Sequence, residues 1–469
     1  MIPVSAFSGR RVAVFGLGRT GRAAARALEA GGAQVSAWDD DEATRAAAAA
    51  EGVTLDDLNK RDWGDIAALV LSPGVPLTHP RPHRMVELAR AVGAPVIGDM
   101  ELFALALKDA EDVKVCGITG TNGKSTTTAL LGHILKTAGR DVRVGGNIGE
   151  AVLNLDHPRP GAVYVIEMSS YQLDLVESLA CDVSVFLNLS PDHLDRHGDI
   201  EGYTAAKRRI FANQSAGDAA IVGVDDAVTK KIFAQLKAAN GRAVYPVSST
   251  RALSEGVYAI GGVLYNAIEG RAEAVMRLDQ APALPGDHNA QNAAAAYAAA
   301  RRLGVTREDA AAGLKSFPGL AHRQEIAGEI GPVRFINDSK ATNADAAARA
   351  LGCYEDIYWI AGGQAKSDGA GDLTRFGPRI RRAYLIGRDA DRFERELSGA
   401  METRRCGDVE RAVALATRDA LSEGAAAPVV LLSPACASFD QFRDFEVRGE
   451  AFKDAASRLI ARASGGDAA

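Results

Sequence analysis

Short runs of β-branched and other apolar residues alternate along the chain with longer stretches of helical periodicity. Such runs of four to six residues, closed by turn residues, predict strands buried on both faces of a sheet. They cover residues 12–15, 67–71, 113–118, 163–166, 183–187, 357–360, 383–386 and 429–432. Several precede a glycine-rich turn and an Ala/Leu-rich helix. This repeated strand–turn–helix order is typical of mostly parallel sheets with helices on both faces, so we predict an α/β protein.

Two breaks in this pattern predict domain boundaries. The segment 95–99 precedes a fresh helix and a second glycine-loop unit, and the segment 317–320 follows two helices and precedes a third set of strands. The length of 469 residues also suggests three domains, at about 150 residues per domain. We therefore predict domains over residues 1–98, 99–319 and 320–469.

Composition narrows the class of protein. The net charge of −6 gives no electrostatic signature of a nucleic-acid-binding or membrane-surface protein. The five cysteines are dispersed and include no C-x-x-C pair, which argues against a disulfide framework and a zinc site. They are Cys116, Cys181, Cys353, Cys406 and Cys436. No apolar run reaches the roughly 18 residues of a membrane helix, and the N-terminus does not resemble a signal peptide. We expect a cytoplasmic protein without membrane insertion.

The first glycine motif is Gly16-Leu-Gly-Arg-Thr-Gly21, which follows a strand and opens a helix, with Asp39 at the end of the next strand. This order is typical of Rossmann-like domains, in which backbone amides approach a phosphate and a carboxylate reaches a ribose hydroxyl. The motif alone would suit NAD, but any nucleotide diphosphate fits the same loop. The turn Ser72-Pro73-Gly74 could supply further backbone donors, and a plain turn is an equally good interpretation.

The second motif is Gly117-Ile-Thr-Gly-Thr-Asn-Gly-Lys-Ser-Thr-Thr127, between a predicted strand and a predicted helix over 125–137. This context predicts a phosphate-binding P-loop, in which Lys124 offsets phosphate charge and Ser125 or Thr126 holds Mg²⁺. Ile118 occupies the position of the first glycine in the usual P-loop pattern. The loop therefore indicates a variant family of ATP-using proteins.

Acidic and histidine residues follow two later strands. Glu167 ends the strand 163–166, and Asp192-His193 follows the strand that begins at residue 183. Beside a P-loop these side chains could complete a Mg²⁺ site, although a lone histidine is more often structural. The run 207–209, Lys-Arg-Arg, by itself predicts a solvated basic helix face.

Several motifs together resemble the Mur ligases, and in particular the branch of that family that adds D-glutamate. The family motifs are Gly120-Thr-Asn-Gly-Lys-Ser-Thr126, Gly145-Gly-Asn-Ile-Gly149, Glu167-Met-Ser-Ser-Tyr-Gln172 and Asp192-His-Leu-Asp-Arg196. Those that resemble the branch are Gly286-Asp-His-Asn-Ala-Gln-Asn292, His322-Arg323, Asn337-Asp-Ser-Lys-Ala-Thr-Asn343 and Ser433-Pro-Ala-Cys-Ala-Ser-Phe-Asp-Gln-Phe442. The resemblance covers nearly the whole chain in order, which makes chance agreement improbable.

This resemblance implies three domains: a Rossmann-like N-terminal domain for the UDP end of the substrate, a central P-loop ATPase domain, and a Rossmann-like C-terminal domain for the amino acid. It implies a carbon–nitrogen ligase of peptidoglycan synthesis that joins D-glutamate to the L-alanyl carboxylate of UDP-N-acetylmuramoyl-L-alanine. ATP would first convert this carboxylate into an acyl phosphate, which the amine attacks with release of ADP and phosphate. The cofactors expected are ATP and Mg²⁺, with two metal sites, in a monomeric protein.

The resemblance also assigns roles to individual residues. The catalytic residues it implies are Lys124, His193 and Lys207. Those for ATP are Gly120, Thr121, Asn122, Gly123, Lys124, Ser125, Thr126, Asn289, Asn292, Arg323 and Asp338. Those for Mg²⁺ are Ser125, Glu167, His193 and Lys207 as a carbamate, which needs a neutral amine and reverses the basic-face interpretation. Those for the UDP substrate are Arg19, Thr20, Asp39, Ser72, Pro73, Gly74, Asn147 and Gln172. Those for D-glutamate are Thr342, Lys366, Ser438, Phe439 and Phe445.

Three alternatives remain open from the sequence. An NAD oxidoreductase would leave the P-loop, Glu167 and His193 without a role. A P-loop switch protein would hydrolyse ATP without dependence on an amino acid. A sibling ligase, which adds another amino acid or extends folate with glutamate, shares the central domain and is the strongest competitor.

Overall fold

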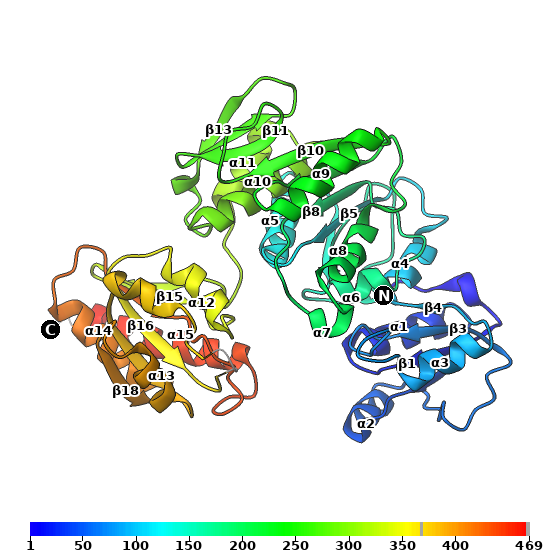
Figure 1. The fold of residues 1–469 in the computed structure, drawn as a ribbon, viewed down its shortest axis with the longest axis horizontal. Coiled ribbons are helices and arrows are strands. Elements are labelled where there is room, and N and C mark those ends of the chain that lie inside the picture. The colour runs from blue at the N-terminus through cyan, green and yellow to red at the C-terminus, as the bar shows by residue number, and fades with distance from the viewer. Residues whose placement is uncertain (366–368, 466–469) are drawn as a thin grey trace. The chain divides into compact units, whose positions relative to one another are not determined.

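The computed structural model describes residues 1–365 and 369–465. These residues separate into two compact units, one of Met1–Ala281 with Asp287–Phe317 and the other of Pro282–Gly286 with the chain from Pro318 onward. In these described ranges the strands form three sheets (Figure 1), two in the first unit and one in the second. The α/β class with parallel sheets, predicted from the strand–helix alternation, is confirmed. The boundaries at residues 98 and 319 stay predictions.

The N-terminal sheet is parallel, with strand order β2-β1-β3-β4. Its elements are η1 Ser5–Phe7, β1 Arg11–Phe15, α1 Arg19–Ala30, β2 Gln34–Trp38, α2 Glu42–Ala50, β3 Ile66–Leu71, α3 Arg84–Ala91 and β4 Val96–Ile97. Helices α1 and α3 pack against its strands (Figure 1). The first glycine motif connects β1 to α1, as the pattern predicted.

The central sheet begins after helix α4 and has nine strands in the order β13-β12-β11-β10-β9-β8-β5-β7-β6. Its first half contains α4 Asp99–Leu107, β5 Lys114–Thr119, α5 Lys124–Thr137, β6 Val142–Gly146, η2 Val152–Asn154, β7 Val163–Glu167, α6 Ser170–Asp174, β8 Val183–Phe186, α7 Leu194–His197, α8 Ile200–Arg208 and η3 Arg209–Phe211. Its second half contains β9 Ala219–Gly223, α9 Ala227–Ala239, β10 Ala243–Ser248, β11 Gly256–Ile260, β12 Val263–Ala267, β13 Glu273–Arg277, η4 Leu278–Gln280, α10 Asp287–Arg302 and α11 Arg307–Ser316. Helices α5, α10 and α11 pack on one another.

Strands β11 to β13 of this sheet pair antiparallel, although β6 to β11 are parallel. The turn between β11 and β12 is Gly261-Gly262, with φ of +59° and +74°. Two residues in the left-handed region favour a tight hairpin, and glycine adopts that conformation without strain. The sequence interpretation did not include this antiparallel extension.

The second unit is built on a six-stranded sheet of order β14-β15-β19-β16-β17-β18, in which only β14 is antiparallel to its neighbour among the described residues. Its elements are β14 Glu325–Ile330, β15 Val333–Asn337, α12 Ala344–Leu351, β16 Ile357–Gly362, η5 Leu373–Arg379, β17 Ile380–Ile386, α13 Ala390–Leu397, β18 Thr403–Gly407, α14 Val409–Ser422, β19 Val429–Leu432 and α15 Phe445–Gly465. Apolar side chains are buried on both faces of this sheet. All eight predicted strands are present in the chain, and the largest shift is the start of β17 at Ile380 instead of 383.

None of the described helices is long and apolar enough to cross a membrane.

Candidate functional site

The second glycine motif forms a loop between β5 and α5. Gly120 and Gly123 have φ of +152° and +81°, which favours glycine at both positions. A Cβ on Gly123 would also lie 2.2 Å from Oδ1 of Asn292. Gly123 is the N-cap of α5 and offers no side-chain cap, so the first turn of the helix presents backbone amides at its positive end. This arrangement suits the binding of phosphate oxygens.

The loop is held by hydrogen bonds from both sides. Lys124 Nζ donates to the carbonyls of Gly120 and Thr121 at 3.0 and 2.9 Å. The amide of Thr121 donates to the carbonyl of Asn188, and the amide of Asn122 donates to its Oδ1, both at 2.9 Å. Two of the amides predicted for ATP therefore donate within the protein. Ser125 and Thr126 are half-buried in the first turn of α5, where the positive end of the helix dipole favours an anion.

Helix α10 brings the two predicted asparagines beside this loop. Asn292 Oδ1 accepts a hydrogen bond from Thr127 Oγ1 at 3.2 Å, and Asn292 Nδ2 donates to Asn289 Oδ1 at 3.0 Å. Both asparagines are buried. The fold thus joins residues that lie more than 160 positions apart in the chain at the start of α5.

Lys207 is buried, with 1% of its surface exposed, under the P-loop. Its Nζ donates to the carbonyl of Gly120 at 2.8 Å and lies 4.7 Å from the centre of the Tyr203 ring. Burial, reinforced by the nearby Lys124 ammonium, lowers the pKa of Lys207 well below its ordinary value. The solvated basic face predicted for this residue from the charge run alone is therefore wrong, because α8 turns Lys207 toward the sheet.

Glu167 ends β7 and is 2% exposed. Its Oε1 accepts a hydrogen bond from Asn147 Nδ2 at 2.7 Å, and its buried Oε2 has no hydrogen-bond partner among the described residues. An orphaned carboxylate oxygen in the interior is costly unless a cation or donor reaches it. The structure thus places a buried carboxylate oxygen, oriented by the hydrogen bond from Asn147, at the end of the strand next to β5.

His193 lies at the start of α7 with φ of +54°. Its side chain is 45% exposed, lies 3.4 Å from the Asp192 carboxylate and packs against Tyr171 and Tyr203. Burial lowers the pKa of His193, against the opposing effect of Asp192. No group of three or more His, Cys, Asp or Glu side chains within the described ranges is arranged to hold a metal. The predicted metal set includes Ser125 and Lys207, which lie outside those residue types.

The N-terminal glycine loop is braced by two predicted substrate residues. The amide of Leu17 donates to Asp39 Oδ2 at 2.6 Å, and Ser72 Oγ donates to the Gly16 carbonyl at 2.7 Å. A Cβ on Gly21 would lie 1.8 Å from the Gly16 oxygen, so this glycine permits close approach of α1 to the loop. One carboxylate oxygen of Asp39 is thereby committed to the loop.

Other predicted substrate residues differ in accessibility. Arg19 is exposed and donates to the carbonyls of Gly149 and, at 3.4 Å, Gly146, while Thr20 is half-buried at the start of α1. Gln172 is buried and forms the capping box of α6, and its Nε2 donates to Asp99 at 3.0 Å. The buried position gives Gln172 a structural role in this conformation.

The sequence interpretation assigned no role to Arg196. Its guanidinium donates to the carbonyls of Gly74 at 2.8 Å and Val75 at 3.0 Å, and at 3.4 Å to that of Pro73. It also lies 4.6 Å from the centre of the Tyr171 ring. Arg196 thus ties the turn after β3 to helix α7, whose N-cap is His193. An arginine three residues beyond the Asp-His pair was the available signal.

The second unit contains the remaining predicted residues. Asp338 is buried at the end of β15 and accepts a hydrogen bond from Ser433 Oγ at 2.7 Å, and burial raises its pKa to about 7. Arg323 is exposed. Ser438 is buried, Thr342 is half-buried and Phe439 is 71% exposed. The ring of Phe445 lies 3.7 Å from Lys340 Nζ. Lys366 lies outside the described residues.

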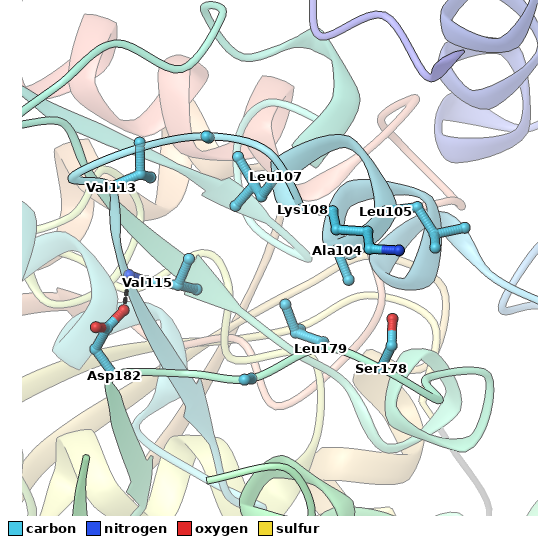
Figure 2. A pocket seen from close by; sticks show the side chains of 11 residues that line it. Ala104, Leu105, Leu107, Lys108, Val113, Val115, Ser178, Leu179 and Asp182 are labelled. Carbon is cyan, nitrogen blue, oxygen red and sulfur yellow. Dashed lines mark hydrogen bonds between the residues drawn. The ribbon is translucent and has the colours of Figure 1, made fainter. Parts of the chain in front are cut away.

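A separate cavity of about 390 Å³ lies at the other end of β5 (Figure 2). Ala104 of α4 lies opposite Leu179, and Val115 lies on β5 close to Asp182. Val115 is near the start of β5, whereas the P-loop follows its end. This cavity therefore does not belong to the phosphate site.

Comparison with known proteins adds to this geometry. Residues 118–300 match the family description of the Mur ligase middle domain. The chain is 58% identical to the UDP-N-acetylmuramoylalanine--D-glutamate ligase of Caulobacter sp. (strain K31), over 98% of both chains. It is 52% identical to the ligase of the same name from Rhizobium etli, over 96% of both chains.

Solved structures show the same fold at lower identity. The crystal structure of UDP-N-acetylmuramate-alanine ligase from Thermotoga maritima matches with a TM-score of 0.58 and 17% identity, over 96% of this chain and 99% of that one. The structure of MurF ligase from Thermotoga maritima in complex with ADP matches with a TM-score of 0.53 and 17% identity, over 84% of this chain and 90% of that one.

Proposed function

This chain belongs to the Mur ligase family, in the branch that adds D-glutamate, and we propose that its reaction takes place where the P-loop, Glu167, His193 and Lys207 converge. It joins D-glutamate to UDP-N-acetylmuramoyl-L-alanine in an ATP-dependent step of peptidoglycan synthesis. The observation that carries the proposed site is the burial of Lys207 and Glu167 beside the phosphate-binding end of α5.

Amide formation from a carboxylate needs activation, because a carboxylate is a poor electrophile. We propose that the γ-phosphoryl group of ATP is transferred to the L-alanyl carboxylate and that the D-glutamate amine displaces phosphate from this acyl phosphate. The first step brings two anions together. The amides at the start of α5 and the Lys124 ammonium would offset their repulsion.

The residues present fit Mg²⁺ at this site. Glu167 offers a buried oxygen without a partner among the described residues, and Ser125 lies in the first turn of α5. Lys207 has a lowered pKa, so its amine is more readily neutral and able to form a carbamate, which would add an oxygen ligand near His193. When bound, Mg²⁺ supplies charge neutralisation of the transferring phosphate. The number of metal sites, predicted as two, stays part of this proposal.

The other assignments rest on the same resemblance. Arg19, Asp39, the turn 72–74 and Asn147 would hold the UDP-muramoyl part, and Asn289 with Asn292 would contact the nucleotide. Thr342, Lys366, Ser438, Phe439 and Phe445 are proposed for D-glutamate. Arg323 and Asp338 stay predicted nucleotide contacts. The monomeric state and cytoplasmic location stay predictions.

The test is ADP and phosphate release with ATP, Mg²⁺ and UDP-N-acetylmuramoyl-L-alanine, while the amino acid is varied among D-glutamate, L-glutamate, L-alanine and meso-diaminopimelate. Turnover restricted to D-glutamate is expected. We further expect Glu167→Gln to lower kcat by about a hundredfold or more, because the buried anionic oxygen is lost. The exposed residue Glu201 on α8 gives a matched control, Glu201→Gln, with unchanged kcat.

Turnover with another amino acid would overturn the substrate assignment. Full activity of Glu167→Gln, at the same Mg²⁺ concentration as the wild type, would overturn the proposed position of the site.

A further inference from the structure

The tip of the P-loop is held by one side chain that has no role in the proposed reaction. Asn188 lies two residues after β8, the strand next to β5 in the sheet. Its Oδ1 accepts from the amide of Asn122 at 2.9 Å, and its Nδ2 donates to the carbonyl of Asn122 at 3.2 Å. The backbone carbonyl of Asn188 accepts from the amide of Thr121. Beyond the last paired residues of β8 and β5, the backbone carbonyl and the side-chain amide of Asn188 thus continue the hydrogen bonding between the two segments.

Two further side chains fix the orientation of this amide. The Nδ2 of Asn188 also donates to Gln291 Oε1 at 3.0 Å, and Gln291 Nε2 donates to Asp225 Oδ2 at 2.9 Å. Asp225 in turn accepts from the amide of Ser249 at 2.8 Å and from Thr250 Oγ1. The chain of hydrogen bonds therefore runs across the carboxyl ends of β5, β8, β9 and β10, which are consecutive in the sheet.

The direction of every bond in this chain follows from its two ends. A backbone amide only donates, so the atom of Asn188 that faces the Asn122 amide must be oxygen. An ionised carboxylate only accepts, so the atom of Gln291 that faces Asp225 must be nitrogen. With both ends fixed, the inner contact can only be Asn188 Nδ2 to Gln291 Oε1. One arrangement satisfies all of the groups, and a fully satisfied polar network rigidifies the segment it contacts.

We infer that Asn188, oriented by Gln291 and Asp225, is a positioning residue for nucleotide binding that sets the P-loop in its phosphate-binding shape. The inference rests on the proposed nucleotide site. Asn188 does not use its amide for phosphate in this arrangement. It fixes Thr121 and Asn122, so that the chain enters α5 at Gly123 with the first-turn amides directed at the anion.

The position of Gln291 strengthens this inference. It lies between Asn289 and Asn292 on α10, and Asn292 lies against Gly123. The same helix therefore contacts the P-loop directly through Asn292 and indirectly through Gln291 and Asn188. Gln291 is 7% exposed, so water has little access with which to replace its hydrogen bonds.

The test is equilibrium binding of a fluorescent ADP analogue to the full-length protein, with thermal unfolding of each variant measured in parallel. Asn188→Asp keeps the size of the side chain but replaces the donor that faces the Asn122 carbonyl and Gln291 with an acceptor. We expect the Kd for ADP to rise about tenfold or more, whereas the KM for D-glutamate changes little. The matched control is Asn266→Asp on β12, a buried asparagine whose Oδ1 accepts from the amide of Ile268. It is expected to bind ADP like the wild type.

A second pair of variants leaves Asn188 intact. Gln291→Glu places a carboxylate against Asp225 and should weaken ADP binding. Adding Asp225→Asn removes the like-charge repulsion. Its amide oxygen can still accept from the Ser249 amide, and the carboxylate at position 291 can still accept from Asn188. The double variant should therefore bind ADP more tightly than Gln291→Glu alone. If Gln291 and Asp225 had only a general structural role, the losses of ADP affinity caused by the two substitutions would instead add in the double variant.

The outcomes distinguish the positioning role from the nucleotide site itself. ADP binding that is unchanged in Asn188→Asp, or a double variant that binds no more tightly than Gln291→Glu, overturns the positioning role. If Asn188→Asp does not fold, the pair at positions 291 and 225 decides the question. Failure of the wild type to bind ADP would overturn the proposed nucleotide site and the inference with it.

Discussion

Replacement of Arg196 by methionine tests whether the turn after β3 is set by the central sheet. The guanidinium donates to the carbonyls of Gly74 and Val75 at 2.8 and 3.0 Å and lies 4.6 Å from the Tyr171 ring centre. Methionine keeps most of the apolar stem and removes the charge and the donors. The turn would then lose its link to α7, although the hydrogen bond from Ser72 would still hold it to Gly16.

The magnitude follows from these contacts. A net contribution of about 0.5–1 kcal/mol for each of two good hydrogen bonds and about 0.5–1 kcal/mol for the cation–π contact gives a total of roughly 1.5–3 kcal/mol. Because ligand binding must then order the turn, the Kd for UDP should rise by about 10- to 100-fold, at about 1.4 kcal/mol per tenfold change. Binding of ADP at the P-loop should be unaffected, because the hydrogen bonds of Arg196 are made to the turn 73–75.

The assay is calorimetric titration of UDP, and separately of ADP, into wild type, Arg196→Met and Arg10→Met. Arg10 provides the control because it lies over the Phe7 ring at 5.6 Å, away from the turn 72–75. Equal UDP affinity in wild type and Arg196→Met would refute the reasoning. An equal loss of ADP and UDP affinity would show a general destabilisation in place of a local one.

Three further predictions follow from single contacts. Gly123→Ala should weaken ADP binding about tenfold or more in a fluorescence titration, because the added Cβ would lie 2.2 Å from Asn292 Oδ1 and the φ of residue 123 is +81°. Binding as tight as in the wild type would show that the loop can shift. Lys207→Met should lower kcat about a hundredfold or more in the ADP-release assay while the Kd for ADP stays within about threefold, and retained turnover would exclude a role for its amine or carbamate. Asp99→Asn concerns stability: burial raises the pKa of Asp99 to about 6, above its ordinary value of 3.8. The folded protein therefore binds more protons than the unfolded chain between about pH 4 and 6, and stability falls as pH rises through this window. Above this window, Asp99→Asn should be more stable than wild type by at most roughly 3 kcal/mol. Calorimetry should show a higher unfolding midpoint for the variant at about pH 7.5 and equal midpoints toward about pH 4. A constant difference in midpoint at all pH values would contradict this explanation.

The eight predicted strands and the two glycine loops could be read from the sequence because their causes are local. Short continuous runs of apolar residues predict which segments are buried strands. Glycine at positions such as Gly123 indicates a backbone conformation that other residues rarely adopt. The α/β class and the P-loop followed from these signals alone. Several other strands were not predicted. Among them, the antiparallel strands β12 and β13 have runs that are short and partly exposed.

The chemical environment of the site was decided by tertiary structure. Charge pattern alone predicted a solvated Lys207, and only the packing of α8 beneath the P-loop buries it and lowers its pKa. The contacts of Asn188 with Asn122 and Gln291 span 66 and 103 positions of sequence. They exist because β8 lies next to β5 and α10 packs on α5. Sheet order is a long-range property, fixed by the burial of whole elements against each other, so no local pattern in the sequence specifies which side chains meet at the strand ends.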